Sequence, residues 1–235
     1  MDRAQRLARL AGWFFIATFV TAIAGDVLYG PVLDHPRYVI GAGADSRIAW
    51  GAIVEMFLIV TNIGTAVALF PVLKRQSEAG ALGYVTARLV ECTFIAIGIV
   101  AVLAVVTLRQ EGGADEGALL AAAQSLVAVK DATFLLGPGF VVGLGNGLLL
   151  GWLMYASGLV PRRMALLGLI GGPLAFLSGV LVLLDVIEAG SAAQFAMTIL
   201  EIAWEASLGI YLVWKGFRRD APILAGDVGH SPVVV

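Results

Sequence analysis

Six polar side chains interrupt long apolar stretches of this 235-residue chain, and they are the residues there that could do chemistry. They are Glu55, Asn62, Arg88, Glu91, Glu201 and Glu205. A charge at bilayer depth costs at least about 2.5–3.5 kcal/mol, so an ionisable residue inside a membrane helix marks a candidate functional site. Buried carboxyl groups predict a site that takes up protons or binds a cation.

The spacing of the charged residues predicts which of them can pair. Arg88 and Glu91 are three residues apart and can form an ion pair on one helix face, for which Glu205 could compete. Glu55 and Glu201 are then left without a cation. Four carboxyls and one arginine cannot all be ionised and paired within the protein, so some carboxyls must be protonated, hydrated or bound to a cation.

Asn62 falls on the Glu55 face of its helix. Asp26 and Asp185 carry less weight, because they lie nearer the ends of their stretches and can reach water. An alternative for the whole set is that these groups only form hydrogen bonds between helices and so specify the packing. Such bonds are common between membrane helices and are individually worth about 0.6 kcal/mol.

Signatures of catalysis are missing from the sequence. The two histidines, His35 and His230, both lie outside the apolar stretches, which leaves no intramembrane histidine–metal site or Ser–His pair. Cys92 is the sole cysteine, so no internal disulfide can form. The glycines lack the adjoining Lys-Ser/Thr of a phosphate-binding loop. We therefore expect no catalytic residue, metal or cofactor, and an intramembrane enzyme is the third interpretation.

The elements that must position these residues are six apolar stretches, each near the roughly 20 residues a helix needs to cross a bilayer. They cover residues 10–29, 48–73, 84–108, 133–156, 164–187 and 195–214. Composition agrees, with 60% apolar residues, 14% charged residues and a mean hydropathy of +0.93. The sequence predicts an all-α, polytopic integral membrane protein with membrane lipid as its neighbour. Ala22-Ile23-Ala24 resembles a signal cleavage site, but the apolar stretch continues to Tyr29, so we expect a retained first helix.

The basic residues are distributed unevenly between the two sides of the predicted bundle. Ten lie on the side of the termini: Arg3, Arg6, Arg9, Lys74, Arg75, Arg162, Arg163, Lys215, Arg218 and Arg219. The other side holds Arg37, Arg47, Arg109 and Lys130, mixed with acidic residues. Retained positive loops mark the cytoplasmic side, so we expect both termini in the cytoplasm and the protein in the inner (cytoplasmic) membrane. The net charge of −2 argues against a nucleic-acid partner.

Two segments lie at the borders of the predicted spans. Residues 1–219 form the predicted membrane domain, and residues 220–235 lack periodicity and are predicted to be a flexible cytoplasmic tail. Near 115–130, leucines and alanines recur at helical spacing. This stretch predicts either a short interfacial helix or an outward extension of the fourth span.

Glycines predict the closest helix contact. Four of them recur at every fourth position of the fourth span, and the fifth span offers a matching surface; the set is Gly139, Gly143, Gly147, Gly151, Gly168 and Gly172. Small residues let membrane helices approach closely. The pattern predicts packing of the two spans within one chain, with a homo-oligomer seam as the alternative.

Six segments of the chain resemble a known family. The segments AGADSRIAWGAIVE, NIGTAVALFPVLKRQ, LLGPGF, ASGLVPR, LGLIGGPL and WEASLGIYLVWKGF resemble, in this order, the bacterial membrane family catalogued as domain of unknown function 4386. The resemblance implies a six-helix integral membrane protein and brings no activity, substrate or cofactor.

Two functional classes therefore remain. The first is a proton- or cation-linked transporter of an unknown small molecule, whose buried glutamates bind protons or a cationic ligand. The second is a non-catalytic sensor or assembly component. A water-accessible cavity containing Glu55, Glu91, Glu201 or Glu205 would favour the first.

Overall fold

The computed structural model describes residues 2–35, 37–41, 43–113 and 115–228, and this part of the chain consists of helices and short connections, without strands. Six helices are long and apolar enough to cross a membrane, which confirms the predicted fold class. They are α1 (Arg3–Leu33), α2 (Asp45–Leu73), α3 (Glu78–Glu111), a 42-residue helix over Glu116–Ser157, α6 (Arg162–Leu183) and α7 (Ala192–Trp214).

Most of these helices are longer than the apolar stretches, because polar residues outside the stretches cap them. Asp2, Ser77, Asp115 and Ser191 each accept a hydrogen bond from a backbone N–H in the first turn of the following helix. Such caps satisfy donors that have no partner within the helix.

The fourth spanning helix is built from four parts. It starts as α4 (Glu116–Phe134), widens into the π-helical segments η2 (Leu135–Val141) and η3 (Gly143–Leu150), and ends as α5 (Gly151–Ser157). The stretch near 115–130 is thus continuous with the spanning helix. π-helical turns are rare and occur frequently at functional sites. Here they coincide with a glycine-rich sequence that includes Pro138, whose ring nitrogen cannot donate a hydrogen bond.

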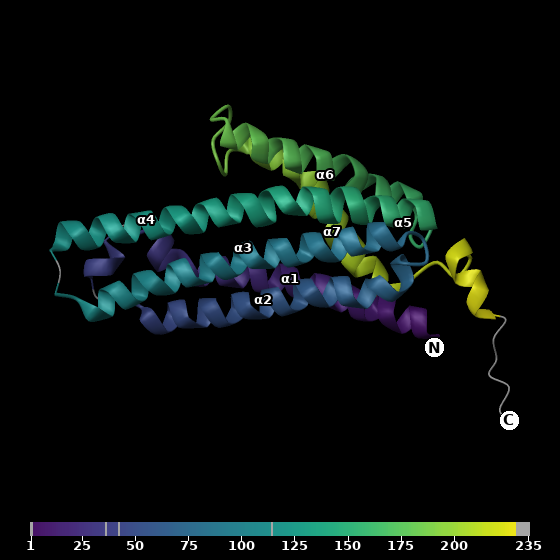
Figure 1. Ribbon diagram of the computed structural model, residues 1–235, viewed down its shortest axis with the longest axis horizontal. Helices are drawn as coiled ribbons and strands as arrows, with labels where there is room; N and C mark the ends of the chain where they lie inside the picture. Colours follow the sequence, from purple (N-terminus) through teal and green to yellow (C-terminus); the bar gives the residue numbers. More distant parts are fainter. Residues whose placement is uncertain (1, 36, 42, 114, 229–235) are drawn as a thin grey trace, which may run out of the picture.

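The helices form an elongated bundle in which Asp2 and the segment up to residue 228, the two ends of the described chain, lie at one end, called the termini end below (Figure 1). α1, α2, α3 and the 42-residue helix run along the long axis, and α6 and α7 form a hairpin beside α5 and η3. The tip of this hairpin, residues 184–191, stands away from α4 and points toward the opposite end of the bundle, the far end, but stops short of it (Figure 1). α7 contacts α1 near the termini end, where a Cβ on Gly12 would lie 2.7 Å from the backbone N of Val213.

Large buried side chains close the termini end. One apolar cluster there joins α1, α2, α3, α5 and α7, and includes Phe15, Leu69, Tyr84, Leu153, Trp204 and Leu212. The tail predicted to be flexible from residue 220 begins with the short helix η4 (Pro222–Val228), whose Leu224 packs into this cluster. Residues 229–235 lie outside the described part of the chain.

The outer surface of the bundle is apolar, as a lipid-facing surface requires. Each spanning helix exposes large apolar side chains, among them Ile23, Phe57, Val100, Phe134, Ile170 and Ile210. Trp13, Trp152 and Trp214 are exposed toward the termini end and Trp50 toward the far end. Tryptophan is enriched at the two membrane–water interfaces, so these residues are placed as interfacial anchors.

The predicted glycines lie in three different environments. Gly143, Gly147 and Gly151 face α6, where a Cβ on Gly147 would lie 2.8 Å from the backbone N of Gly172. A Cβ on Gly168 would instead meet the indole ring of Trp204. The remaining predicted glycine, Gly139, has no other helix within contact distance of a Cβ and lines a cavity.

Candidate functional site

A cavity of about 540 Å³ lies between α7 and the faces of α1, α2, α3 and α4. Its charged lining comprises Asp26, Glu55, Arg88, Glu91, Lys130, Glu201 and Glu205. All five charged residues of the predicted site therefore border one space. The predicted Asn62 is fully buried behind it, and Asp185 is an exposed residue just after the C-cap of α6 and is not part of the lining.

The end of the cavity nearer the termini is formed by a cluster around Arg88, which we call the arginine cluster (Arg88, Glu91, Glu205, Asn62 and Asn146). Arg88 Nη1 lies 2.7 Å from Glu91 Oε2, and Nη2 lies 3.8 Å from Glu205 Oε1. Asn62 donates a hydrogen bond of 3.0 Å to the other oxygen of Glu91. Asn146 donates from its amide to Glu205. The arginine is 2% exposed, so its partners must replace the water that it has lost.

Aromatic rings complete the surroundings of the guanidinium. The Arg88 carbon Cζ is 5.7 Å from the centre of the Phe15 ring and 5.9 Å from that of Tyr84. The Tyr84 hydroxyl also lies 3.4 Å from Arg88 Nε and 3.2 Å from the Thr65 hydroxyl. Cation–π contacts of this kind add to the stability of a desolvated cation.

A second ion pair borders the cavity toward the far end. Lys130 Nζ lies 2.6 Å and 2.9 Å from the two oxygens of Glu55, and 5.0 Å from the centre of the Tyr29 ring. Both charged side chains are less than 10% exposed. From the sequence, Lys130 was expected on the side away from the termini, outside the spans, and Arg88 was expected to be the only cation within them. The structure corrects both points, because α4 continues straight into the membrane span and carries Lys130 inward.

Glu201 lies one turn before Glu205 on α7 and borders the same cavity. It is 3% exposed, and neither carboxyl oxygen has a hydrogen-bond partner in the described structure. Its Oε2 would lie 2.5 Å from a Cβ on Gly147, so the absence of a side chain at that position leaves room for the carboxyl group. A buried polar group without a partner is costly, and in a native protein it calls for an explanation.

The π-helical segment brings Asn146 to this region. Its backbone oxygen accepts a hydrogen bond of 2.9 Å from Trp204 Nε1, and its side chain contacts Glu205 one residue further along α7. Asn146 did not enter the predicted site. The signal that could have found it is a single amide side chain within the glycine-rich apolar stretch of the fourth span.

The cavity is closed toward the termini and opens beside the hairpin tip. The apolar cluster around Trp204 and Phe15 fills the bundle beyond the arginine cluster. A second buried apolar cluster, which includes Tyr29, Ile48 and Val105, fills the far end between α1, α2, α3 and α4. The exposed lining residues mark the opening and come from α1, α4, the hairpin tip and the first turn of α7: Ile23, Asp26, Phe134, Gly190 and Phe195. A ligand could therefore enter between the hairpin tip and the α1–α4 helices, but has no open path to the termini.

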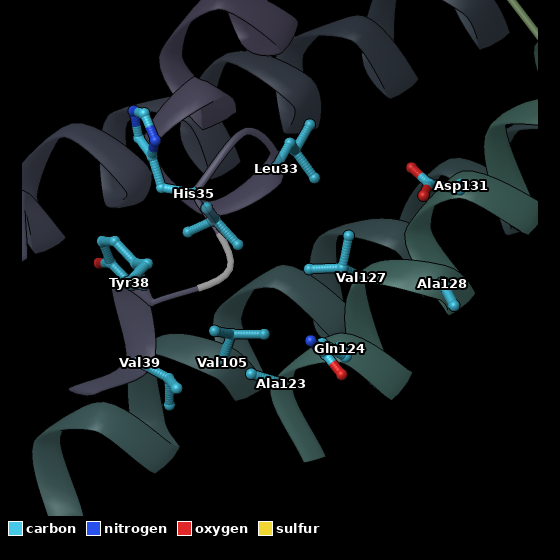
Figure 2. Close-up of a pocket in the computed structure, with 11 residues that line it drawn as sticks. Leu33, His35, Tyr38, Val39, Val105, Ala123, Gln124, Val127, Ala128 and Asp131 are labelled. Carbon is cyan, nitrogen blue, oxygen red and sulfur yellow. The ribbon is translucent and has the colours of Figure 1, made fainter. Parts of the chain in front are cut away.

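A smaller cavity of about 160 Å³ lies at the far end between the α1–α2 connection, α3 and α4. Its polar lining residues do not converge: Figure 2 shows His35 and Asp131 on opposite sides of the view, with Gln124 apart from both. The described residues contain no group of three or more histidine, cysteine or acidic side chains placed to hold a metal ion.

Comparison with known proteins places the chain in a family. The family model described as Domain of unknown function (DUF4386) matches residues 10–216, which span all six membrane helices apart from the first turns of α1. No curated protein and no solved structure matches the chain. Because the family model covers most of the sequence, the chain belongs to the DUF4386 family.

Proposed function

We propose that the protein is a proton- or cation-linked transporter of a small molecule, located in the inner (cytoplasmic) membrane with both termini in the cytoplasm. The observation that carries the proposal is the cavity at mid-bundle, which opens beside the hairpin tip, is closed at the termini end and is lined by both buried ion pairs. Transporters bind substrate near the bilayer midplane and expose the site to one side at a time.

The alternative of packing alone accounts less well for this arrangement. Polar groups that only specify helix contacts would be satisfied by their neighbours and sealed from water. Glu201 is buried without a partner, and Arg88 Nη2 also lacks a hydrogen bond within the described structure. Both side chains line the cavity. Unused hydrogen-bonding capacity at a cavity wall supports binding of a ligand or ion there.

The charge balance of the lining supports a positive ligand. Five carboxyl groups (Asp26, Glu55, Glu91, Glu201 and Glu205) face the cavity with two cations, Arg88 and Lys130. The two short ion pairs use one carboxyl each, which leaves three. An anionic substrate would meet this excess of negative groups, whereas a proton or a cation would relieve it.

A non-transporting sensor is the second candidate. The packed termini end favours it, because a ligand bound at mid-bundle meets the large side chains around Trp204 and Phe15. In a sensor these side chains would stay in place. In a transporter the contact between α1 and α7 must open to let the ligand pass.

Proton flux across membranes that contain the purified protein distinguishes a transporter from a sensor. Proteoliposomes containing a pH-sensitive dye would be loaded at low pH and diluted into solutions of Na⁺, K⁺ or ethylammonium. A transporter should release protons in response to at least one of these cations, and Glu205→Gln and Glu91→Gln should abolish the response. Glu111→Gln is the matched control, since Glu111 is exposed at the end of α3. A dye response that is absent for all three cations, or unchanged in Glu205→Gln, would contradict transport of these cations through this site.

A further inference from the structure

We infer that the cavity binds an organic ammonium ion with an apolar body. Its N–H groups bind the Glu201 carboxyl group, and its apolar body lies against α1, α6 and α7. This inference rests on the proposed function only in using the same cavity as a ligand site. It concerns binding and assigns to Glu201 the role of ligand acceptor.

The Glu201 side chain is 3% exposed, and both of its carboxyl oxygens lack a hydrogen-bond donor within the described residues. Glu205, one turn along α7, receives a hydrogen bond from Asn146 and lies near Arg88, so its needs are partly met. Among the buried carboxyl groups of the cavity, Glu201 therefore has the largest unused capacity to accept hydrogen bonds.

The unpartnered carboxyl group of Glu201 matches the chemistry of an organic ammonium ion. An ammonium group carries three N–H donors and a positive charge, so it can satisfy both oxygens of a carboxylate. A hard divalent cation would want six or more oxygen ligands around it. No such convergence is found among the described acidic side chains.

The cavity is large enough for a small organic molecule, and much of its wall is apolar. A volume of about 540 Å³ is in the range of sites for small organic molecules and is far larger than an inorganic ion. Much of the wall is apolar and includes Phe19, Ala22, Val142, Ala175, Phe195 and Ile202. An ammonium ion with an aromatic or branched aliphatic body would bury that body here and gain free energy from the hydrophobic effect.

Exposed apolar residues at the cavity opening give a ligand access from the membrane. Phe134, Ile23 and Phe195 line the cavity and are each about 60% exposed on the lipid-facing surface. Asp26 lies beside them and is also exposed. An amphiphilic cation held near the membrane surface could thus approach an opening that has an acidic group at its rim and apolar walls behind it.

The test measures equilibrium binding by calorimetry to the full chain in lipid nanodiscs. The probe is 2-phenylethylammonium, and the matched neutral probe is 2-phenylethanol, with empty nanodiscs as the background. The ammonium should bind saturably to the wild type and to Glu111→Gln. Its affinity should fall at least about tenfold in Glu201→Gln, because a charge-assisted hydrogen bond is lost. The alcohol should bind the wild type at least about tenfold more weakly than the ammonium for the same reason.

Equal affinity of the two probes for the wild type would overturn the inference, and this comparison does not depend on the folding of any variant. Unchanged ammonium affinity in folded Glu201→Gln would overturn it as well. The result is separate from the transport proposal. Ammonium binding without flux in proteoliposomes would contradict transport and support the ligand assignment, whereas Na⁺ or K⁺ flux without ammonium binding would contradict the ligand assignment alone.

Discussion

Lys130 and Glu55 illustrate how single residues decide the electrostatics of the site. The carboxyls and Arg88 could be found from the sequence because each interrupts an apolar stretch. Lys130 was missed because this residue stands at the end of the Ala- and Leu-rich stretch near 115–130, outside the predicted fourth span, and Asp131 follows it. Only the length of the helix in three dimensions reveals that this lysine lies level with Glu55. Pairing between distant segments, here 75 residues apart, is not encoded in local spacing.

The first prediction concerns this ion pair. Lys130→Met should lower stability more than the double variant Lys130→Met with Glu55→Gln, because the single change leaves a buried carboxylate without its cation. Removing one partner of a buried pair costs about 3–5 kcal/mol, whereas replacing both with neutral groups costs less. Thermal unfolding in detergent and in lipid, measured for both variants and for Glu55→Gln alone, checks the order.

A double variant that is no more stable than Lys130→Met would show that the two groups do not depend on each other. The exposed Lys74 provides the control, since Lys74→Met removes a positive charge at the helix end without uncovering a buried partner. Its unfolding temperature should stay close to that of the wild type.

At the scale of elements, the fourth span does most to shape the site. The spacing of its glycines predicted a common face, and Gly143, Gly147 and Gly151 do face α6. The π-helical geometry was not predictable from that spacing, because glycine repeats are equally compatible with an α-helix. It is nevertheless part of the site, since it places Asn146 against α7 and turns Gly139 toward the cavity.

The second prediction compares two glycines of this helix. Gly147→Leu should destabilise the fold by about 1–3 kcal/mol, because the new side chain would overlap the backbone of Gly172 and the carboxyl group of Glu201. Gly139→Leu should fold nearly as well as the wild type, since a Cβ there lies 3.6 Å from its closest neighbour, within ordinary contact distance. Yield and thermal unfolding in lipid test the difference. Similar behaviour of the two variants would remove the case for a close contact at Gly147.

Gly139→Leu also serves as a functional variant. Its side chain would enter the cavity, so affinity for 2-phenylethylammonium should fall while the unfolding temperature is maintained. Full affinity in a folded Gly139→Leu protein would place the probe elsewhere on the molecule.

For the whole molecule, six spans follow from hydropathy alone, because each must satisfy its backbone inside the membrane. Hydropathy does not predict the cavity. The cavity exists because α7 lies close to α1 at Gly12 and Gly209 near the termini end, whereas the first turn of α7 helps to line the opening. Crossing points between helices depend on tertiary packing, so the sequence could name the carboxyl groups but not the space they share.

The last prediction concerns the direction in which that space opens. The basic residues at the termini end predict that this end is cytoplasmic and that the cavity opens to the outside.

Cys92 is the only cysteine and is buried, so Cys92→Ser provides a background for single reporters. Ala189→Cys reports on the far end and Ala79→Cys on the termini end; both positions are exposed and uncharged, so neither change alters the charge distribution that orients the chain. In intact cells an impermeant maleimide should label Ala189→Cys, and Ala79→Cys should react only after the membrane is opened. The reverse pattern would invert the orientation and make the observed cavity one that opens to the cytoplasm.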